Sequence, residues 1–449
     1  MGWNHGRHCR GQNERVIRTI AQLAAALGGS VHGGSVDVVV DRMILDSRSG
    51  RRGDGFVAVR AERDGHHFVR AARSAGAVVA IVDHLIDDGP SIVVDDTIAA
   101  LTRGGRVARS ELAGDVIGTT GSVGKTTTKD LTAAILGRSR RVTASELSLN
   151  NELGVPLTLL NAVEGTEVSV IELGARGIGH VAELCEIAAP TIGVVTVVAP
   201  AHLELFGSLE AIVEAKGELI EALPSSGTAV LNADSPEVMS MAGRTSARVL
   251  SFGDVGEVRM TDVELDRRLV VSAVIQTPWG SAPVRLGVSG RHQIVNAAAA
   301  AAAALVAGAS LEDVVSGLAL PVESPWRMEV AHSRSGATVI NDAYNANPES
   351  MAAALRALAE LDAERRVAVL GEMAELGVTS DVEHVAISDL ARSLGIELVA
   401  IGTSRYGVEP MVAENLAELL SPMDERIAVL VKGSRVGRLE VLAAVLLDE

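Results

Sequence analysis

The segment Gly118–Asp130, which reads G-T-T-G-S-V-G-K-T-T-T-K-D, has the residue types and the spacing of a phosphate-binding loop. It follows the apolar pair Val116 and Ile117 and opens a segment with helical spacing. The backbone N–H groups of such a loop and the positive end of the helix dipole attract phosphate. Lys125 would reach the terminal phosphates, and the Thr126 hydroxyl would hold a magnesium ion. A chance Gly-Lys-Thr turn is the alternative, but the flanking strand and helix favour a nucleotide site. The loop residues expected to bind the nucleotide are Gly121, Ser122, Val123, Gly124, Lys125, Thr126 and Thr127.

Two further polar side chains follow apolar runs that the pattern predicts to be strands. Glu172 lies at the end of Glu167–Leu173, and His202 follows Ile192–Val198 in the turn A-P-A-H-L-E. Because parallel sheets bind ligands beyond the carboxyl ends of their strands, we expect both residues on the same rim as the phosphate loop. Magnesium prefers oxygen ligands, so Thr126 and Glu172 fit directly. A lone histidine is more often structural, but the position of His202 after the second strand favours a metal ligand.

The composition indicates a protein of several domains that does not bind nucleic acid. At ~100–200 residues per domain, 449 residues suggest two to four domains. A net charge of −17 argues against a general nucleic-acid partner, and 2% aromatic residues leave few platforms for stacking bases. An anionic substrate must therefore be bound by local cations or helix ends.

Cysteine usage and hydropathy indicate a soluble, cytoplasmic protein. Cys9 and Cys185 are too few for a disulfide framework or a four-thiolate zinc site. The start of the chain has several arginines and no long apolar core behind them, so we expect no signal peptide. The most apolar stretch, Ala297–Ala309, is shorter than the ~20 residues of a membrane span.

The elements that must position these residues follow an α/β pattern in three parts. Residues 1–111, with a loose tail at 1–14, predict a small α/β domain. Residues 112–320 alternate strands and helices as a mostly parallel sheet requires, and residues 321–449 predict a separate Rossmann-like domain. The last part lacks G-x-G-x-x-G after its first strand, which argues against a nicotinamide cofactor. The expected strands are Val36–Val40, Phe56–Val59, Val78–Val82, Ile92–Val94, Glu167–Leu173, Ile192–Val198, Thr338–Asn341, Val367–Leu370, Leu398–Ile401 and Ile427–Val431.

Several helices are expected between these strands. The expected helices are Val16–Leu27, one ending near Gly76, Ser208–Leu223, one beginning near Asn296, Pro348–Leu361 and one from Leu439. Asn347 should cap the helix that starts at Pro348. The amphipathic helix Ser208–Leu223 carries Lys216, and the pattern alone would leave this lysine in solvent. The polar clusters D-S-R and D-G-H-H-F in the first part are explained equally well by surface loops.

Nine motifs in order along the chain resemble the muramyl ligase family of cell-wall amide ligases, from about Val16 to the end. Besides the phosphate loop they are N-N-E-L-G-V-P-L-T-L-L (Asn150–Leu160), I-E-L-G-A-R-G-I-G-H, A-H-L-E-L-F-G-S, A-K-G-E (Ala215–Glu218), L-N-A-D (Leu231–Asp234), W-R-M-E (Trp326–Glu329), N-D-A-Y-N-A-N-P-E-S-M (Asn341–Met351) and L-G-E-M-A-E-L-G (Leu370–Gly377). The motifs Y-N-A-N-P and A-H-L-E-x-F-G-S are similar to those of the member that adds D-alanyl-D-alanine to UDP-N-acetylmuramoyl-tripeptide.

This resemblance implies a fold and a reaction. It implies three domains, for the UDP-sugar peptide, for ATP and for the incoming dipeptide. The substrate carboxylate would attack the γ-phosphate of ATP, and the dipeptide amine would then attack the acyl phosphate. No enzyme nucleophile is needed, which agrees with the lack of a Ser-His-Asp or Cys-His set. Cofactors would be ATP and Mg²⁺, and we expect a monomer whose partners are these small molecules.

The resemblance also implies roles for individual residues. The catalytic set would be Lys125, Glu172, His202 and Lys216, with Thr126, Glu172, His202 and Lys216 at the metal. Lys216 matches a lysine that can be carbamylated into an oxygen-donor ligand, which is the opposite of a solvent position. Asn296, Arg327 and Asp342 match contacts to adenine, phosphate and ribose. Substrate contacts would come from Asp46, Ser47 and Arg48 near the uridine, Asn150 and Asn151 along the muramyl peptide, and Tyr344, Asn345 and Asn347 at the dipeptide.

The chain departs from the family pattern at several positions, and two other functions stay open. The first glycine of the loop stands at Gly118 instead of position 119, Gln293 replaces an asparagine in G-x-H-N-x-x-N, and Glu372 replaces an aspartate in L-G-D-M. One alternative is a sister muramyl or polyglutamate-type ligase with another amine acceptor, although a D-N-P-R motif and a four-cysteine insert are both absent. The other is a nucleotide-dependent switch or scaffold that ligates nothing.

Overall fold

The computed structural model describes residues 19–86, 89–199, 203–322 and 324–448, which form two compact units. The first unit takes in Met1–Val116, Arg140–Ile171 and Leu184–Ala189, and the second takes in Ile117–Ser139, Glu172–Glu183 and Pro190–Glu449. The chain is α/β with mostly parallel sheets, as the sequence predicts. The domain boundaries expected at 111/112 and 320/321 stay a prediction. Among the described helices, none has both the length and the apolarity needed to cross a membrane.

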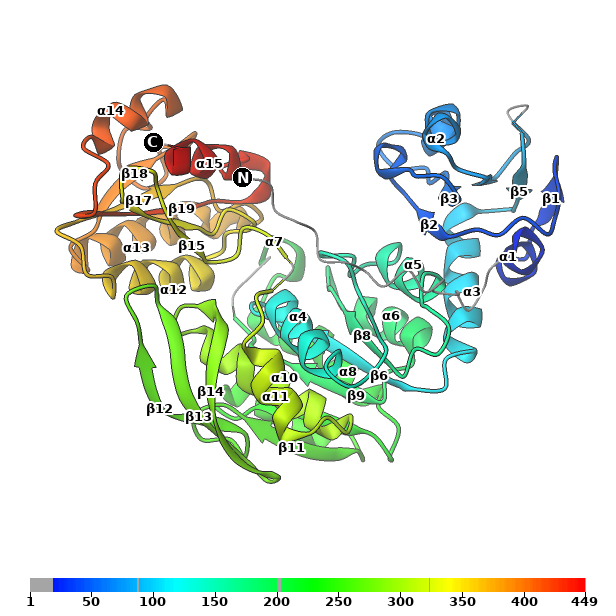
Figure 1. Cartoon of the computed structure of the whole chain (residues 1–449), viewed down its shortest axis with the longest axis horizontal. Helices are drawn as coiled ribbons and strands as arrows, with labels where there is room; N and C mark the ends of the chain where they lie inside the picture. Colours follow the sequence, from blue (N-terminus) through cyan, green and yellow to red (C-terminus); the bar gives the residue numbers. More distant parts are fainter. Residues whose placement is uncertain (1–18, 87–88, 200–202, 323, 449) are drawn as a thin grey trace. The chain divides into compact units, whose positions relative to one another are not determined.

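The first unit begins with a five-stranded sheet in the order β1-β5-β4-β3-β2 (Figure 1). Its strands are β1 Ser30–His32, β2 Arg42–Ile44, β3 Asp54–Val57, β4 Val79–Val82 and β5 Ser91–Val93, and its helices are α1 Ile20–Leu27, α2 Val69–Ala75 and α3 Thr97–Ser110. All pairs are parallel except β1 with β5. The strand predicted at Val36–Val40 is wrong. Among the described residues this β-branched run pairs with no strand, and Val39 alone makes a single bridge, to Thr19.

The remainder of the first unit continues the α/β pattern. It contains β7 Val142–Ala144, α5 Gly154–Leu160 and β8 Val168–Glu172, with β7 parallel to β8. Helix α3 packs against α5 through glycines: a Cβ at Gly105 would lie 2.5 Å from the Cβ of Pro156. Asn161 connects this part to β2, because its side chain accepts a hydrogen bond from the Met43 N–H and donates one to the Met43 carbonyl.

The second unit holds the parallel strands that carry the phosphate loop, in the order β11-β10-β9-β6. Their bounds are β6 Asp115–Thr120, β9 Ile192–Val195, β10 Thr228–Asn232 and β11 Arg248–Phe252. The helices of this part are α4 Lys125–Leu136, α7 Leu203–Phe206, α8 Leu209–Glu221, α9 Pro236–Met239, α10 Gln293–Val306 and α11 Leu311–Leu318. Helix α6 His180–Ala188 has its first four residues in this unit and the others in the first unit. The alanine run of α10 is buried and packs against α4, since small side chains allow close approach of the two helices.

Three antiparallel strands interrupt the strand–helix alternation that the sequence predicts for residues 112–320. They are β12 Arg259–Leu265, β13 Val270–Thr277 and β14 Gly280–Ser289, in the order β12-β13-β14. Their residues alternate between buried and partly exposed positions, as in a sheet with one solvated face. The short 3₁₀ helices of the chain are η1 Ser47–Ser49, η2 Gly65–Phe68, η3 Ser240–Arg244, η4 Gly377–Thr379, η5 Ala413–Asn415 and η6 Arg435–Gly437.

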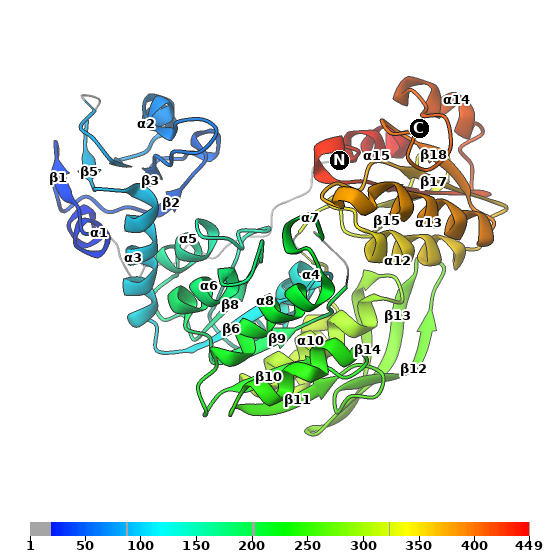
Figure 2. The ribbon, with the colours of Figure 1, turned by 180° about the vertical axis from the view of Figure 1, so that it is seen from behind.

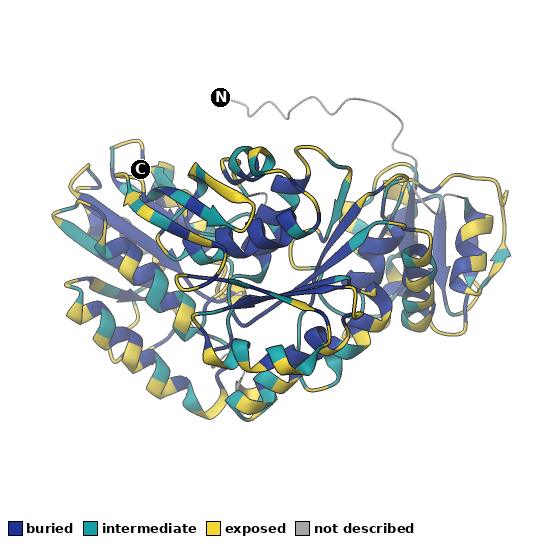
Figure 3. Ribbon diagram, turned by 90° about the horizontal axis from the view of Figure 1, so that it is seen from below, coloured by how far each residue is buried: buried dark blue, intermediate teal, exposed yellow. Residues whose placement is uncertain are grey.

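The C-terminal part of the second unit is a five-stranded sheet in the order β15-β16-β19-β17-β18. Its strands are β15 Glu329–His332, β16 Thr338–Asn341, β17 Arg365–Leu370, β18 Glu397–Ala400 and β19 Ile427–Lys432, parallel except for β15. Helices α12 Pro348–Ala359 and α13 Ser380–Ser393 pack on one face, and α14 Leu416–Leu420 and α15 Glu440–Asp448 on the other (Figures 1 and 2). The inner helix faces and the strands are buried, while the outer helix faces are exposed (Figure 3).

Candidate functional site

The phosphate loop joins β6 to α4 through two glycines that have no room for a side chain. Gly121 has φ of +148° and Gly124 has φ of +84°, in the range that favours glycine. A Cβ at Gly121 would lie 1.9 Å from Thr196 Oγ1, and one at Gly124 would lie 2.2 Å from Asn296 Oδ1. Gly124 is also the residue before the first helical residue of α4, so the N-terminal N–H groups of α4 face the loop.

The segment after β9 holds the loop in place through two backbone carbonyls and the Thr196 side chain. The Ser122 hydroxyl donates to the Ala199 carbonyl at 2.9 Å, and the Ser122 N–H donates to the Val197 carbonyl at 2.7 Å. Thr196 Oγ1 donates to the Val123 carbonyl at 2.6 Å. The predicted phosphate ligands Ser122 and Val123 are therefore fixed by the next strand, so the loop has a defined shape.

Lys125 and Thr126 begin α4 and meet Arg327 of the W-R-M-E motif. Lys125 Nζ donates to the Gly121 carbonyl at 2.8 Å, so its amine lies over the loop. Arg327 Nη2 donates to Thr126 Oγ1 at 3.0 Å. Thr127, the next loop residue on the predicted list, is buried behind them.

Arg327 is held by its neighbours in a strained turn. Its guanidinium carbon lies 4.1 Å from the centroid of the Tyr344 ring, so the two side chains make a cation–π interaction. The flanking residues Trp326 and Met328 have φ of +58° and +51°, which is unusual for residues with a side chain. Arg327 Nε is buried without a hydrogen-bond partner among the described residues, so this arginine has a donor left for a ligand.

Glu172 lies beside the loop and interacts electrostatically with it. It is the last residue of β8 and is 1% exposed. The Leu173 N–H donates to the Thr119 carbonyl at 2.8 Å, which aligns the ends of the two strands. Burial lowers the pKa of Lys125, the Glu172 carboxylate opposes this shift, and the charge of Arg327 adds to it. The charges of Glu172 and Arg327 therefore both act on the amine of Lys125.

Lys216 is buried, and the solvent position that its helix pattern suggests is wrong. It lies on α8, which Ser208 caps, and is 5% exposed. Its Nζ lies 6.0 Å from the centroid of the Phe206 ring. Burial lowers the pKa of Lys216 well below its ordinary value, and the positive charge of Lys125 lowers it further. Both effects favour the neutral form of the amine, and the influence of Lys125 connects Lys216 to the same site. His202, the other predicted metal ligand, lies outside the described residues.

The predicted adenine residue Asn296 is fixed by the residue at which the chain departs from the family pattern. Asn296 Nδ2 donates to Gln293 Oε1 at 2.7 Å, and both side chains come from the first turn of α10. Its Oδ1 contacts Gly124 of the loop, so Asn296 lies against the phosphate loop. Burial lowers the pKa of the nearby His292 to about 4, which leaves this imidazole neutral.

The predicted ribose residue Asp342 is paired with a lysine that sequence reasoning missed. Lys432 Nζ donates to Asp342 Oδ2 at 2.5 Å and to the Asn345 carbonyl at 2.8 Å. The Met328 N–H donates to Asp342 Oδ1 at 3.1 Å. Lys432 is 2% exposed at the end of β19. Its place directly after the apolar run Ile427–Val431 is the sequence signal that could have indicated a buried lysine.

The residues expected at the dipeptide have structural contacts of their own. Tyr344 presents its ring face to Arg327, and the Asn345 carbonyl accepts the Lys432 bond. Asn347 caps α12, as predicted, because its Oδ1 accepts a hydrogen bond from the Ser350 N–H at 2.9 Å. These residues form a chain of contacts from Arg327 to the carboxyl edge of the C-terminal sheet.

The predicted substrate residues of the first unit lie on turns. Asp46 caps η1 by accepting the Arg48 N–H at 2.9 Å, and its carboxylate also pairs with the Arg48 guanidinium at 2.6 Å, while Ser47 lies between them. Asn151 Oδ1 accepts the Gly154 N–H at 3.0 Å and so begins α5, and Asn150 precedes it. Each of these groups is partly or fully exposed.

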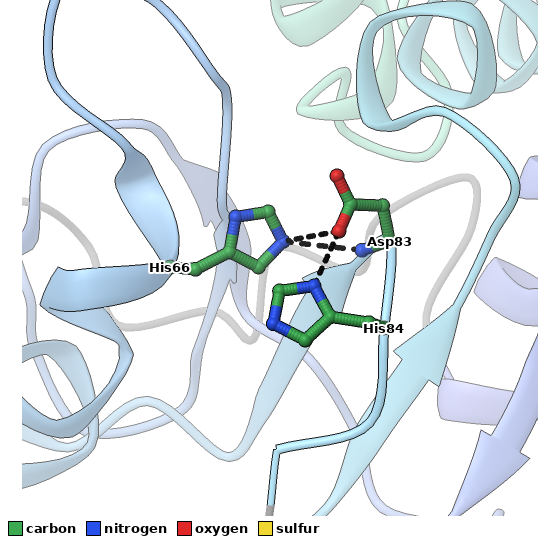
Figure 4. Close-up of side chains that lie close together, drawn as sticks. All are labelled: His66, Asp83 and His84. Atoms are coloured by element: carbon green, nitrogen blue, oxygen red, sulfur yellow. Dashed lines mark hydrogen bonds and ion pairs between the residues drawn. The ribbon is translucent and has the colours of Figure 1, made fainter.

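A cluster of His66, Asp83 and His84 in the first unit has ligand atoms close enough for a metal ion. His66 Nε2 lies 3.2 Å and His84 Nδ1 2.5 Å from Asp83 Oδ1, and both rings point at this carboxylate (Figure 4). However, Arg60 donates to both Asp83 oxygens at 2.6 and 3.0 Å. His66 Nε2 also accepts the Asp83 N–H at 3.1 Å. Because these donors use the lone pairs that a cation needs, we interpret the cluster as a hydrogen-bonded ion-pair network.

Comparisons with known proteins bear on what this site does. Residues 119–304 match the Mur ligase middle domain, and residues 326–435 match the Mur ligase, glutamate ligase domain. The UDP-N-acetylmuramoyl-tripeptide–D-alanyl-D-alanine ligase of Mycobacterium tuberculosis is 42% identical over 86% of this chain and 83% of its own length. The crystal structure of MurF from Acinetobacter baumannii is similar with a TM-score of 0.85 and 33% identity over 96% of this chain and 99% of that one. MurF ligase from Thermotoga maritima, solved in complex with ADP, is similar with a TM-score of 0.78 and 29% identity over 90% of this chain and 96% of that one.

The Lys432–Asp342 pair generates a prediction about stability. We expect Lys432→Met to lower the free energy of unfolding by about 3–5 kcal/mol, because it leaves the mostly buried Asp342 carboxylate without its cation. Adding Asp342→Asn to that variant removes the unpaired charge and should recover part of the loss. Urea unfolding followed by circular dichroism measures both changes. A double variant that is less stable than Lys432→Met would contradict this account of the pair.

Proposed function

The chain belongs to the Mur ligase family, and we propose that it joins D-alanyl-D-alanine to UDP-N-acetylmuramoyl-tripeptide, converting ATP to ADP and phosphate. The observation that carries this proposal is the contact between Arg327 and Thr126. It unites the phosphate loop with the W-R-M-E and N-D-A-Y-N motifs, because Arg327 also stacks on Tyr344. The relatives with this activity and the relative that holds ADP support it.

The reaction follows from the groups that meet at the loop. A carboxylate oxygen of the tripeptide attacks the γ-phosphorus, and the bond from that phosphorus to the ADP oxygen breaks. The dipeptide amine then attacks the acyl carbonyl, loses a proton, and expels inorganic phosphate as the amide forms. The protein needs no nucleophile for either step, only orientation of the reactants and positive charge on the transferring phosphoryl group.

The cations of the site supply that charge. Lys125 lies over the loop, Arg327 donates to the Thr126 hydroxyl, and both would contact the oxygens of the transferring group. The free Nε of Arg327 gives it a donor for this purpose. The Glu172 carboxylate favours the protonated form of Lys125, because it opposes the lowering of the Lys125 pKa by burial.

The residues of the site fit a magnesium ion. The Thr126 hydroxyl and the buried Glu172 carboxylate are the hard oxygen donors that this ion prefers, and we propose His202 as a further ligand. Burial favours the neutral form of the Lys216 amine, and this is the form that reacts with carbon dioxide to give a carbamate with two more oxygen donors. When bound, magnesium supplies positive charge to the phosphate oxygens.

The remaining proposals concern the substrates. We propose that Asn296 and Asp342 bind the adenosine of ATP. Asp46, Ser47 and Arg48 would contact the uridine, and Asn150 and Asn151 the muramyl peptide. We also propose a monomeric enzyme of the cytoplasm, where ATP and UDP-linked precursors are made.

Product analysis tests the proposed reaction. The protein is incubated with ATP, Mg²⁺, the UDP-muramyl tripeptide and each of several amines: D-alanyl-D-alanine, D-glutamate, L-lysine and diaminopimelate. We expect mass spectrometry to find the nucleotide-linked pentapeptide with D-alanyl-D-alanine alone. A product with one of the other amines would indicate a sister ligase, and ADP without any heavier nucleotide product would indicate a switch.

Lys125→Ala tests the phosphate loop. We expect kcat to fall by about 10²–10³-fold or more, since the variant loses a cation at the transferring phosphoryl group. Phosphate release with both acceptor substrates measures this loss, and circular dichroism checks the fold. Arg138→Ala, an exposed cation just after the same helix, is the matched control and should keep full activity. Equal activity of the two variants would disprove the role of Lys125.

Lys216→Ala tests the buried lysine. We expect the variant to lose activity and to recover part of it with acetate or formate, because a short carboxylate can replace the oxygens of a carbamate. The measurement is phosphate release as a function of carboxylate concentration, with chloride at equal ionic strength as the control. Full activity without added carboxylate would exclude Lys216 from the metal site.

A further inference from the structure

The connections of the C-terminal sheet diverge at the carboxyl ends of its neighbouring strands β16 and β19. Both strands are parallel, but the chain after β16 enters α12 on one face and the chain after β19 enters α15 on the other. Parallel sheets bind ligands at such a point, where the connections diverge. The loop after β16 carries Asp342, Tyr344 and Asn345, which are already part of the proposed site. The segment Lys432–Arg438, at the end of β19 and after it, reads K-G-S-R-V-G-R, and of its residues only Lys432 belongs to the proposed site.

Arg435 in this loop has a guanidinium that is fixed on two sides and exposed on the rest. Its central carbon lies 4.3 Å from the centroid of the Trp326 ring. Its Nη1 lies 2.7 Å from Glu440 Oε1, whose side chain is 10% exposed, while the Arg435 side chain is 51% exposed. Stacking and the ion pair hold the fork of donors in one orientation, and such a fork suits a carboxylate.

Arg435 is connected to the phosphate loop through the Trp326–Arg327 segment. Trp326, on which it stacks, is the residue before Arg327, and Arg327 contacts Thr126. A dipeptide whose amine reaches the activated carbonyl near Arg327 has its own carboxylate at the other end. Two extended residues span about 7 Å, so that carboxylate must be received close to the same turn.

The loop after β19 is also locally cationic in a chain of net charge −17. Lys432, Arg435 and Arg438 fall within seven residues, and the N-terminus of α15 follows them. Lys432 forms a buried ion pair with Asp342, whereas Arg435 and Arg438 are exposed. An anion is therefore attracted to this edge by Arg435, Arg438 and the helix end together.

We propose that Arg435 binds the terminal carboxylate of the incoming D-alanyl-D-alanine and so determines specificity for a free dipeptide. This inference rests on the proposed ligase function and names a residue of its amine site. The face of Trp326 would pack against the guanidinium that the carboxylate engages. An acceptor without this carboxylate would lose the paired hydrogen bonds and the charge attraction.

A cleft of about 630 Å³ on the same sheet offers another arginine, and its charges make it the weaker candidate. It is lined by Glu372, Asp381, Thr403 and Arg405 among others. Arg405 already pairs with Asp381, and its Nε lies 3.5 Å from Glu372. Two carboxylates beside one guanidinium repel an additional carboxylate. Arg405 therefore provides the matched control for Arg435.

The test crosses two variants with two acceptors. Initial rates are measured for wild type, Arg435→Ala and Arg405→Ala with D-alanyl-D-alanine and with its C-terminal amide. Each substrate is varied in turn while the other two are saturating. We expect wild type to prefer the acid by about 10–100-fold in kcat/KM, as for hydrogen bonds to a charged group. We expect Arg435→Ala to lose this preference through a higher KM for the acid, with KM for ATP unchanged. Arg405→Ala should keep the wild-type preference.

Several outcomes would overturn the proposal. One is an unchanged preference for the acid over the amide in Arg435→Ala, and another is loss of this preference in Arg405→Ala instead. A third is a higher KM for the UDP-muramyl tripeptide in Arg435→Ala, which would place the tripeptide's carboxylate at Arg435. If Arg435→Ala does not fold, Arg435→Lys and Arg435→Gln replace it, and lysine should keep more of the preference than glutamine. Failure of the proposed function gives a different result, because wild type would then form no pentapeptide with either acceptor.

Discussion

The structure depends on bringing one cation, Arg327, from the segment before β15 to the hydroxyl of Thr126. The Arg327 guanidinium donates a hydrogen bond to Thr126 Oγ1 at 3.0 Å, and its face stacks on the Tyr344 ring. The cost is visible in the backbone, since Trp326 and Met328 both have positive φ. Such strain persists only where the surroundings enforce it, and here Asp342 and Glu329 accept the N–H groups of Met328 and Trp326. The loop of β16 thus sets the position of the arginine at the phosphate site.

The same site concentrates charge in a buried place, which links stability to chemistry. Lys125, Glu172 and Lys216 would each be costly to bury alone. The Glu172 carboxylate acts on the pKa of Lys125, and the charge of Lys125 acts on the pKa of Lys216. Burial pushes Lys216 toward the neutral amine, while Glu172 preserves the charge of Lys125. Burial therefore acts on both lysines of this site, but only the pKa of Lys125 is supported by a neighbouring carboxylate.

The parts that could be predicted from the sequence are those set by local pattern. The glycines of the phosphate loop, the strand Thr338–Asn341 and the cap at Asn347 depend on neighbouring residues, and all three are found in the structure. Partners distant in sequence could not be found this way. The run Val36–Val40 reads as a strand but pairs with no strand in the part of the chain that the structure describes. Lys216 reads as a solvent residue but is buried. The pairing of Lys432 with Asp342 joins residues 90 apart in the chain, beyond the reach of any local pattern. The roles of the individual site residues stay predictions.

The central claim is that the loop, Arg327 and the buried charges activate a carboxylate by phosphorylation. An isotope measurement tests it most directly. The tripeptide is prepared with ¹⁸O in its terminal carboxylate, turned over with ATP and D-alanyl-D-alanine, and the released phosphate is analysed by mass spectrometry. The account predicts that each inorganic phosphate carries one ¹⁸O from the carboxylate. Phosphate that forms at the same rate as the amide but contains no ¹⁸O would contradict it.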